Sequence, residues 1–178
     1  MPINIKSIFK INVSSSEPLT EWLNHPNSLT DKLYQIKGDA RIQLLSQSWT
    51  YTDWWDRYLL QIPDERVFQR EIIMKSHGIP YWYARSIIPK KCYELDPVFF
   101  GRLQNESIKN LIFDREKVSR LQCINYPVDQ RCLEYYWVKK NLDVTGVLWL
   151  RLAEFSFQHK ESFYLVEIML PELETITP

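Results

Sequence analysis

The sequence of 178 residues has no excess of charge of either sign, because 22 basic residues balance 22 acidic ones. This balance gives no general attraction to nucleic acid or to an anionic membrane, so no nucleic-acid partner is expected. Long apolar runs are missing, and residues 1–6 lack the apolar region of a signal peptide. We therefore expect a cytoplasmic protein without a membrane span, whose partner is a small molecule.

Cysteine, histidine and glycine are also scarce. The three cysteines, Cys92, Cys123 and Cys132, form an odd set without Cys-x-x-Cys spacing, which predicts reduced thiols and no zinc site. The three histidines lie beside a proline or at expected turns, so neither a metal site nor a histidine-centred triad is predicted. Motifs for a phosphate loop or a serine nucleophile elbow are missing as well.

What the chain does contain is enough apolar sequence for one core. A chain of this length buries roughly 70% of its unfolded surface. We expect a single domain over residues 1–178, in which residues 1–17 form a poorly ordered N-terminal extension.

Apolar periodicity predicts a helical hairpin followed by a sheet. Ser14-Ser15-Ser16-Glu17-Pro18 is typical of a helix start, and Ser28 and Gly38 fit the two ends of a second helix over residues 29–36. Residues 51–63 fit either a loop or a short helix. Further helices are expected at residues 95–103 and 108–113. Strands are expected at residues 41–49, 68–75, 81–88, 133–139, 148–157 and 162–170, with another between 114 and 129.

One arginine stands out, because it lies in an aromatic-rich strand that ends at Pro89. Strand alternation places Arg85 on the same face as Tyr81 and Tyr83. A guanidinium cannot lose its charge, so a buried one needs a carboxylate or phosphate partner. Two interpretations stay open: an ion pair with an internal Asp or Glu, which is the commoner outcome for an isolated strand arginine, or a ligand carboxylate.

Glu167 repeats this pattern in the last predicted strand. It lies four residues before Pro171, as Arg85 lies four residues before Pro89. If both face one pocket, Arg85 would hold an anionic end of a ligand, and Glu167, with a pKa raised by burial, would exchange a proton or hydrogen bond at the other end. The alternative is a direct ion pair between the two, and their spacing does not decide the matter.

The order and spacing of several short motifs resemble the chorismate pyruvate-lyase family, from about Trp22 to Pro171. The motifs are Trp22-Leu23, Asn27-Ser28-Leu29-Thr30, Arg70-Glu71-Ile72-Ile73-Met74, Pro80-Tyr81-Trp82-Tyr83-Ala84-Arg85-Ser86-Ile87-Ile88-Pro89, Leu148-Trp149 and Leu165-Val166-Glu167-Ile168-Met169-Leu170-Pro171.

The resemblance implies an α+β fold: a single antiparallel sheet of about six strands, with helical flaps over a buried ligand pocket. It also implies cleavage of chorismate to 4-hydroxybenzoate and pyruvate without a cofactor, the first committed step toward ubiquinone. We expect the protein to be a monomer. By similarity Arg85 matches the arginine that binds the ring carboxylate, and Glu167 the glutamate at the hydroxyl end. Leu29 and Ile108 fall at apolar flap positions. Arg151 is a candidate for the pyruvate carboxylate that no motif fixes.

The chain departs from the family pattern in the second flap, where Ser107-Ile108-Lys109 replaces a Pro-Leu-Gly stretch. Such a bulky charge is expected to alter flap closure. Two other functions stay open: a lyase relative that makes another hydroxybenzoate, and a non-catalytic domain that binds small aromatic acids. Effector-sensing domains of bacterial transcription regulators look similar in fold. They follow a DNA-binding helix-turn-helix, for which too few residues precede Leu29 here.

Overall fold

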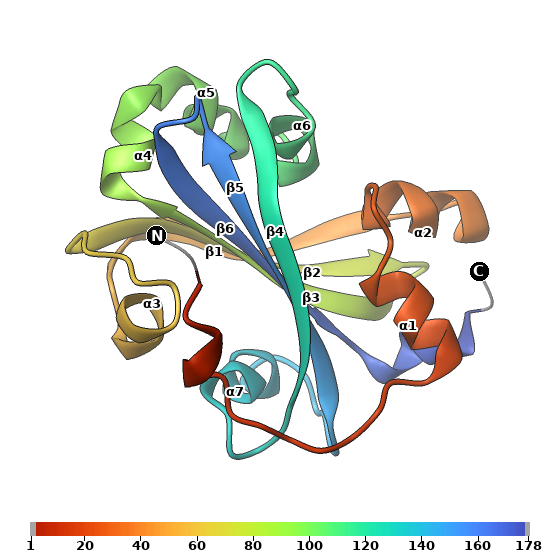
Figure 1. Cartoon of the computed structure of the whole chain (residues 1–178). Helices are drawn as coiled ribbons and strands as arrows, with labels where there is room; N and C mark the ends of the chain where they lie inside the picture. Colours follow the sequence, from red (N-terminus) through yellow and green to blue (C-terminus); the bar gives the residue numbers. More distant parts are fainter. Residues whose placement is uncertain (1–2, 177–178) are drawn as a thin grey trace.

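A computed structural model of the chain describes residues 3–176 and shows one antiparallel sheet of six strands. The order across the sheet is β1-β2-β3-β6-β5-β4 (Figure 1). This confirms the predicted α+β fold. The strands are β1 (Arg41–Tyr51), β2 (Arg66–Ser76), β3 (Ile79–Pro89), β4 (Val118–Val128), β5 (Leu148–Phe157) and β6 (Glu161–Met169).

The hairpin of β2 and β3 turns at the predicted residues. His77 and Gly78 both have positive φ, 48° and 80°, as a tight two-residue hairpin turn requires. Pairing starts with Ser76 opposite Ile79 and then shifts by one residue at Met74 and Lys75. From there Glu71 lies opposite Arg85, so a β-bulge near the turn sets which side chains meet in the middle of the sheet.

The helical hairpin forms as predicted. The Ser28 hydroxyl accepts the Asp31 N–H at 3.1 Å at the start of α2, and Gly38 ends this helix with φ of 73°. The α-helices are α1 (Glu17–Leu23), α2 (Leu29–Lys37), α3 (Trp54–Tyr58), α4 (Lys90–Leu95), α5 (Pro97–Gly101), α6 (Ile108–Ile112) and α7 (Leu133–Lys139). Short 3-10 turns lie at Ile5–Ser7, Arg102–Gln104 and Pro171–Thr175.

The strand predicted at residues 133–139 is wrong, since this segment is helix α7. Its aromatic residues favour strands by composition, but strand preference mostly reflects packing on a sheet surface. Here Tyr135 and Val138, three residues apart, are both buried on one helical stripe, and Trp137 packs edge-on against Trp55 of α3 with ring centroids 4.8 Å apart. Tertiary packing therefore overrides local composition.

The sheet separates two apolar clusters. On one face, residues of α1, α2 and α4–α6 pack with strand residues such as Trp82 and Phe163. On the other face, α3, α7 and Ile3 pack with residues such as Tyr83 and Val166. Figure 1 shows α1 and α2 near one end of the sheet and α6 beside β4. The alternation of each strand thus sorts its side chains between two separate environments.

The N-terminal segment contacts the second cluster, where Ile3 is buried and the Asn4 N–H donates to the Leu59 carbonyl at 2.8 Å. Residues 1 and 2 lie outside the described part of the chain. The poor order of residues 1–17 and the extent of the single domain, residues 1–178, stay predictions. None of the helices between residues 3 and 176 has the length and apolar character needed to cross a bilayer.

Candidate ligand-binding site

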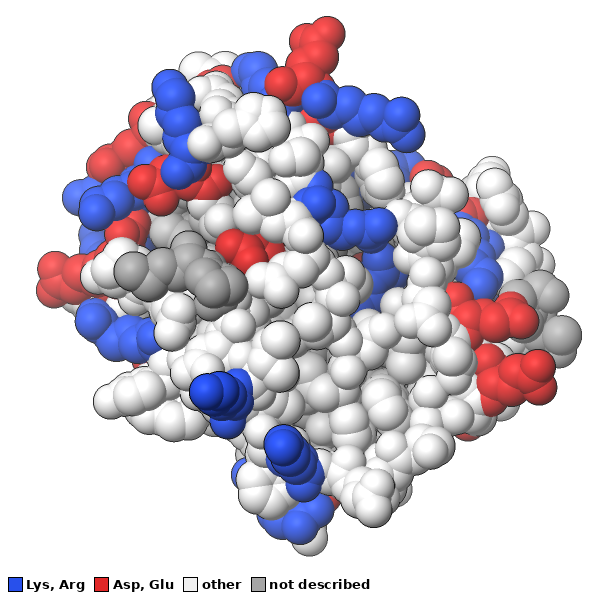
Figure 2. All heavy atoms as spheres, in the orientation of Figure 1, with Lys and Arg blue, Asp and Glu red and all other residues white. Residues whose placement is uncertain are grey.

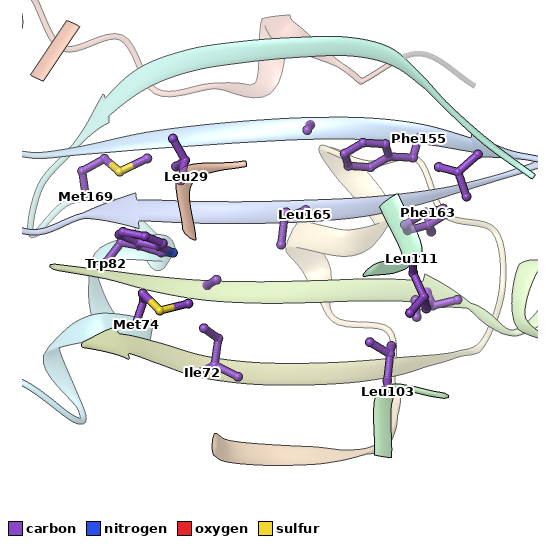
Figure 3. Close-up of a cluster of buried hydrophobic side chains, with 14 of the residues drawn as sticks. Leu29, Ile72, Met74, Trp82, Leu103, Leu111, Phe155, Phe163, Leu165 and Met169 are labelled. Carbon is purple, nitrogen blue, oxygen red and sulfur yellow. The ribbon is translucent and has the colours of Figure 1, made fainter. Parts of the chain in front are cut away.

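A cavity of about 400 Å³ lies between the first face of the sheet and the two helices α2 and α6. Its floor is built from side chains that share one strand face. Their strands are aligned so that Ile72, Ala84, Glu167 and Arg151 form a continuous row across β2, β3, β6 and β5. In Figure 3, Ile72, Trp82 and Leu165 project from this face and Leu29 approaches from α2. The cavity is thus an apolar chamber with a few polar groups.

Glu167 is the carboxylate of this chamber and is 9% exposed. Burial raises the pKa of Glu167 above its ordinary value, while the charges of Arg151 and Arg120 oppose that shift. A buried carboxyl group with an elevated pKa is a stronger base than an exposed one and can exchange a proton with a bound ligand. Glu167 thus lies in a pocket, as the sequence predicted, whereas its catalytic role stays a proposal.

Arg151 lies next to Glu167, with its Nε 3.6 Å from a carboxylate oxygen. This separation is long for a hydrogen bond, and Nε instead donates to the sulfur of Cys123 at 3.4 Å. Nη1 is buried without a hydrogen-bond partner in the part of the chain that the structure describes. A buried guanidinium with an unpaired donor is costly, and because Arg151 lines the cavity it is a candidate for binding an anion there.

Arg70 also lines the cavity, from β2. It is 7% exposed, and its Nε donates to the neutral side chain of Gln47 at 3.0 Å. No ion pair of Arg70 occurs among residues 3–176. Burial lowers the pKa of Arg70 below its ordinary value, as expected for a cation removed from water without an anionic partner. Arg70 is therefore a second candidate for binding a ligand carboxylate.

Arg85 does not face this cavity, and the expectation that it shares a pocket with Glu167 is not met. It projects from the opposite face of the sheet, where its Nη2 donates to Glu71 at 2.6 Å and its Nε to the Tyr83 hydroxyl at 3.1 Å. Its guanidinium carbon lies 3.7 Å from the ring centroid of Trp137. The internal ion pair, the more ordinary of the two sequence interpretations, is what forms.

The partner of Arg85 is held by several donors at once. The carboxylate of Glu71 accepts hydrogen bonds from Ser46, Tyr83 and Arg85, and Lys140 Nζ lies 3.3 Å from both of its oxygens. Burial opposes ionisation of Glu71, but these hydrogen bonds and the Arg85 charge outweigh it and lower the pKa of Glu71 to about 2. Because the carboxylate of Glu71 already provides the counter-charge of Arg85, this arginine does not need an anionic ligand.

The two flaps are α2 and α6, and the predicted flap residues lie where expected. Leu29, 3% exposed, and Ile108 both line the cavity. Lys109, the bulky residue expected to alter closure, also lines the cavity, and its Nζ lies 2.8 Å from a carboxylate oxygen of Asp31 on α2. This ion pair joins the two flaps over the cavity, so the substitution adds a contact between them.

Arg70 was not predicted as a site residue, although it belongs to the motif Arg70-Glu71-Ile72-Ile73-Met74. Alternation along β2 places Arg70 with Ile72 and Met74, and Glu71 on the other face with Ile73. An arginine on the same strand face as Ile72 and Met74 was the feature of the sequence that could have identified Arg70. Arg85 attracted attention because its surroundings are more apolar in sequence.

Comparison with known proteins gives a consistent result. The model of a family described as chorismate lyase matches residues 10–174. A probable chorismate pyruvate-lyase of Pseudoalteromonas atlantica is 28% identical over 163 residues, covering 86% of this chain and 80% of that protein. A chorismate pyruvate-lyase of Pectobacterium atrosepticum is 21% identical over 126 residues, covering 70% of this chain and 68% of that protein.

Solved structures with a similar fold include domains of regulator proteins. The effector domain of PhnF from Mycobacterium smegmatis has a TM-score of 0.56 at 14% identity, covering 82% of this chain and 90% of that domain. The ligand-binding domain of a putative GntR-family regulator from Bordetella bronchiseptica has a TM-score of 0.53 at 10% identity, covering 76% and 85%. At such identities these structures show a shared fold.

Proposed function

This chain belongs to the chorismate lyase family, and we propose that it cleaves chorismate to 4-hydroxybenzoate and pyruvate, which would supply a precursor for ubiquinone. The observation that carries the proposal is that Arg70 and Glu167, two strands apart, line one cavity with apolar walls. Arg70, in place of Arg85, binds the ring carboxylate. Trp82 and Leu29 provide apolar surface for the ring.

Arg70 and Glu167 lie two strands apart on the face of the sheet that lines the cavity. Arg70 lies opposite Ser86, and Glu167 lies opposite Ala84 on the other side of β3. Two strand spacings and a two-residue offset separate their Cα atoms by about 12 Å. Both side chains extend from these Cα atoms toward one cavity, and we propose that a ring with its carboxylate and hydroxyl group at opposite positions binds between them.

Arg151 fits the second carboxylate of chorismate. The enolpyruvyl ether is attached to the ring carbon next to the one that bears the hydroxyl group. Its carboxylate must therefore lie near the hydroxyl end, where the guanidinium of Arg151 lies beside Glu167. A guanidinium at this place would bind the carboxylate and stabilise negative charge on the departing enolate.

The chemistry is an elimination that makes the ring aromatic. The proton on the hydroxyl-bearing carbon leaves, its electron pair forms the third ring double bond, and the bond from the neighbouring carbon to the ether oxygen breaks. The enolate of pyruvate departs and is protonated to pyruvate. Glu167 is the base at the hydroxyl end, and its proton can return to the leaving group. Because aromatisation drives the reaction, orientation and exclusion of water by the flaps are its main requirements, and no cofactor enters the scheme.

A chorismate assay tests this proposal. Purified protein incubated with chorismate should release equal amounts of 4-hydroxybenzoate and pyruvate. Chromatography measures the 4-hydroxybenzoate, and a coupled lactate dehydrogenase assay measures the pyruvate. No release of either product would refute the proposal. Thermal stabilisation by 4-hydroxybenzoate without cleavage of chorismate would point instead to a non-catalytic binding domain, and 3-hydroxybenzoate would identify a different lyase.

Replacing Glu167 with glutamine should lower kcat by about 10²- to 10⁴-fold, the usual contribution of a general base, while 4-hydroxybenzoate still binds. The carboxylate form is the active one, so wild-type activity should fall as pH decreases through the pKa of Glu167, which burial places above the ordinary value of 4.5. The variant should lack this acid limb in its pH–rate profile. Unchanged kcat together with an unchanged profile would make Glu167 structural.

A further inference from the structure

The cavity is strongly basic although the whole chain is neutral. Among its described lining residues there are five cationic side chains and one carboxylate, that of Glu167. The cationic residues are Arg70, Lys109, Arg115, Arg120 and Arg151. Arg70 and Arg151 are buried in the chamber, and Lys109 is neutralised by Asp31. Two cations of the lining therefore have no role in the site as described so far.

Those two, Arg115 and Arg120, lie at the mouth of the cavity. Arg115 is in the short connection between α6 and β4, Arg120 is near the start of β4, and both are exposed. Neither makes an ion pair or a side-chain hydrogen bond within residues 3–176, even though Asp114 and Glu116 flank Arg115 in the chain. Figure 2 shows basic side chains gathered at the hollow between β4 and α2.

The field of this mouth extends into the chamber. Arg120 is one of two cations whose charge opposes the burial-induced rise in the pKa of Glu167. A charge that is felt at the buried carboxylate is also felt by an anion on its way there. Low-dielectric walls around a cleft lined by one sign of charge focus that field and increase the rate at which oppositely charged ligands arrive.

We propose that Arg115 and Arg120 form a cationic rim that accelerates the capture of a dianionic substrate. This inference rests on the proposed function, because chorismate carries two carboxylates whereas 4-hydroxybenzoate carries one near pH 7. Attraction scales with ligand charge, so the rim acts more strongly on the substrate than on the aromatic product. Exposed charges are screened beyond about 8 Å at physiological ionic strength, so the effect must weaken with salt.

The test measures association rates by stopped-flow tryptophan fluorescence, since Trp82 lines the cavity. Glu167→Gln serves as the background, so that chorismate binds without rapid turnover. Removing both rim charges with Arg115→Gln/Arg120→Gln should lower the association rate of chorismate by about 10-fold at 20 mM ionic strength, and that of 4-hydroxybenzoate by about 3-fold. Both differences should nearly vanish at 500 mM salt.

A matched control removes two exposed cations that do not line the cavity. Arg57 lies on α3 and Lys6 in the N-terminal segment, both on elements that pack on the other face of the sheet. Arg57→Gln/Lys6→Gln makes the same change in net charge and should leave both association rates unchanged. If the control variant lost as much association rate as the rim variant, net charge alone would explain the effect, and the proposed role of Arg115 and Arg120 would be refuted.

The outcomes separate the two proposals. Ligand binding with identical, equally salt-dependent rates in the rim variant would refute the rim and leave the proposed function intact. Binding of neither chorismate nor 4-hydroxybenzoate to the unmodified protein by titration calorimetry would refute the proposed function and the rim with it. A loss that is equal for both ligands and persists at 500 mM salt would indicate a structural role for the two arginines.

Discussion

Arg70→Met is expected to reduce kcat/KM for chorismate by about 10³-fold and to abolish measurable binding of 4-hydroxybenzoate. Losing a buried, charge-assisted contact to a carboxylate costs about 2–5 kcal/mol, because the partner anion is left without its counter-charge. Arg70 is the cation of the chamber whose only side-chain hydrogen bond among the described residues is to neutral Gln47, so little else depends on its charge.

The same substitution should leave the protein folded. Removing a buried cation that has no internal ion pair relieves a desolvation cost, so the free energy of unfolding should stay equal or rise. Calorimetry with 4-hydroxybenzoate and urea denaturation check the two halves of this expectation. Lys75→Met, a cation on the same strand that does not line the cavity, is the control. An active Arg70→Met enzyme would mean that another group binds the ring carboxylate.

Arg85→Met should have the opposite outcome: a large loss of stability and little loss of chemistry in the molecules that remain folded. Removing one partner of a buried ion pair costs about 3–5 kcal/mol, since it leaves an uncompensated charge. Here the carboxylate of Glu71 would remain, 4% exposed, with the Tyr83 hydroxyl, Ser46 and half-exposed Lys140. Urea denaturation at pH 7 measures the loss, and activity is normalised to the folded fraction.

The pH dependence of this pair has a defined sign. Because the pKa of Glu71 is about 2 in the folded protein and 4.5 is its ordinary value, the stabilisation from its ionised form is complete above pH 4.5 and is lost as pH falls toward 2. Arg85→Met should show a weaker acid dependence of stability than the wild type between those values. A second variant, Arg85→Met/Glu71→Met, removes both charges and should recover part of the lost stability.

The pair of arginine variants also distinguishes two assignments of the carboxylate-binding residue. Loss of activity in a stable, well-folded Arg85→Met protein would restore the interpretation made from the sequence. Loss of activity in Arg70→Met with a folded protein supports the assignment made from the cavity. The two residues lie on adjacent strands but on opposite faces of the sheet, so neither substitution should perturb the surroundings of the other directly.

Local sequence determined much of this protein. Caps and apolar spacing were enough to predict the helical hairpin, since Ser28 and Gly38 act within a few residues of their own helix. Strand periodicity and a terminating proline singled out Glu167 as an anomalous charge, and the order of motifs indicated the family. Composition misled at residues 133–139, where packing of Trp137 against α3 decided for a helix.

What only the tertiary structure decided is which arginine faces the cavity. The two-residue turn at His77 and Gly78 places Ser76 opposite Ile79. Without a shift, the same register would bring Arg70 opposite Arg85. The shift at Met74 and Lys75 moves the register by one residue, so Glu71 meets Arg85 on one face and Arg70 is left in the cavity on the other. A one-residue shift leaves little trace in the local sequence pattern, yet it changes every cross-strand neighbour beyond it. Which arginine lines the cavity is therefore a property of the assembled sheet.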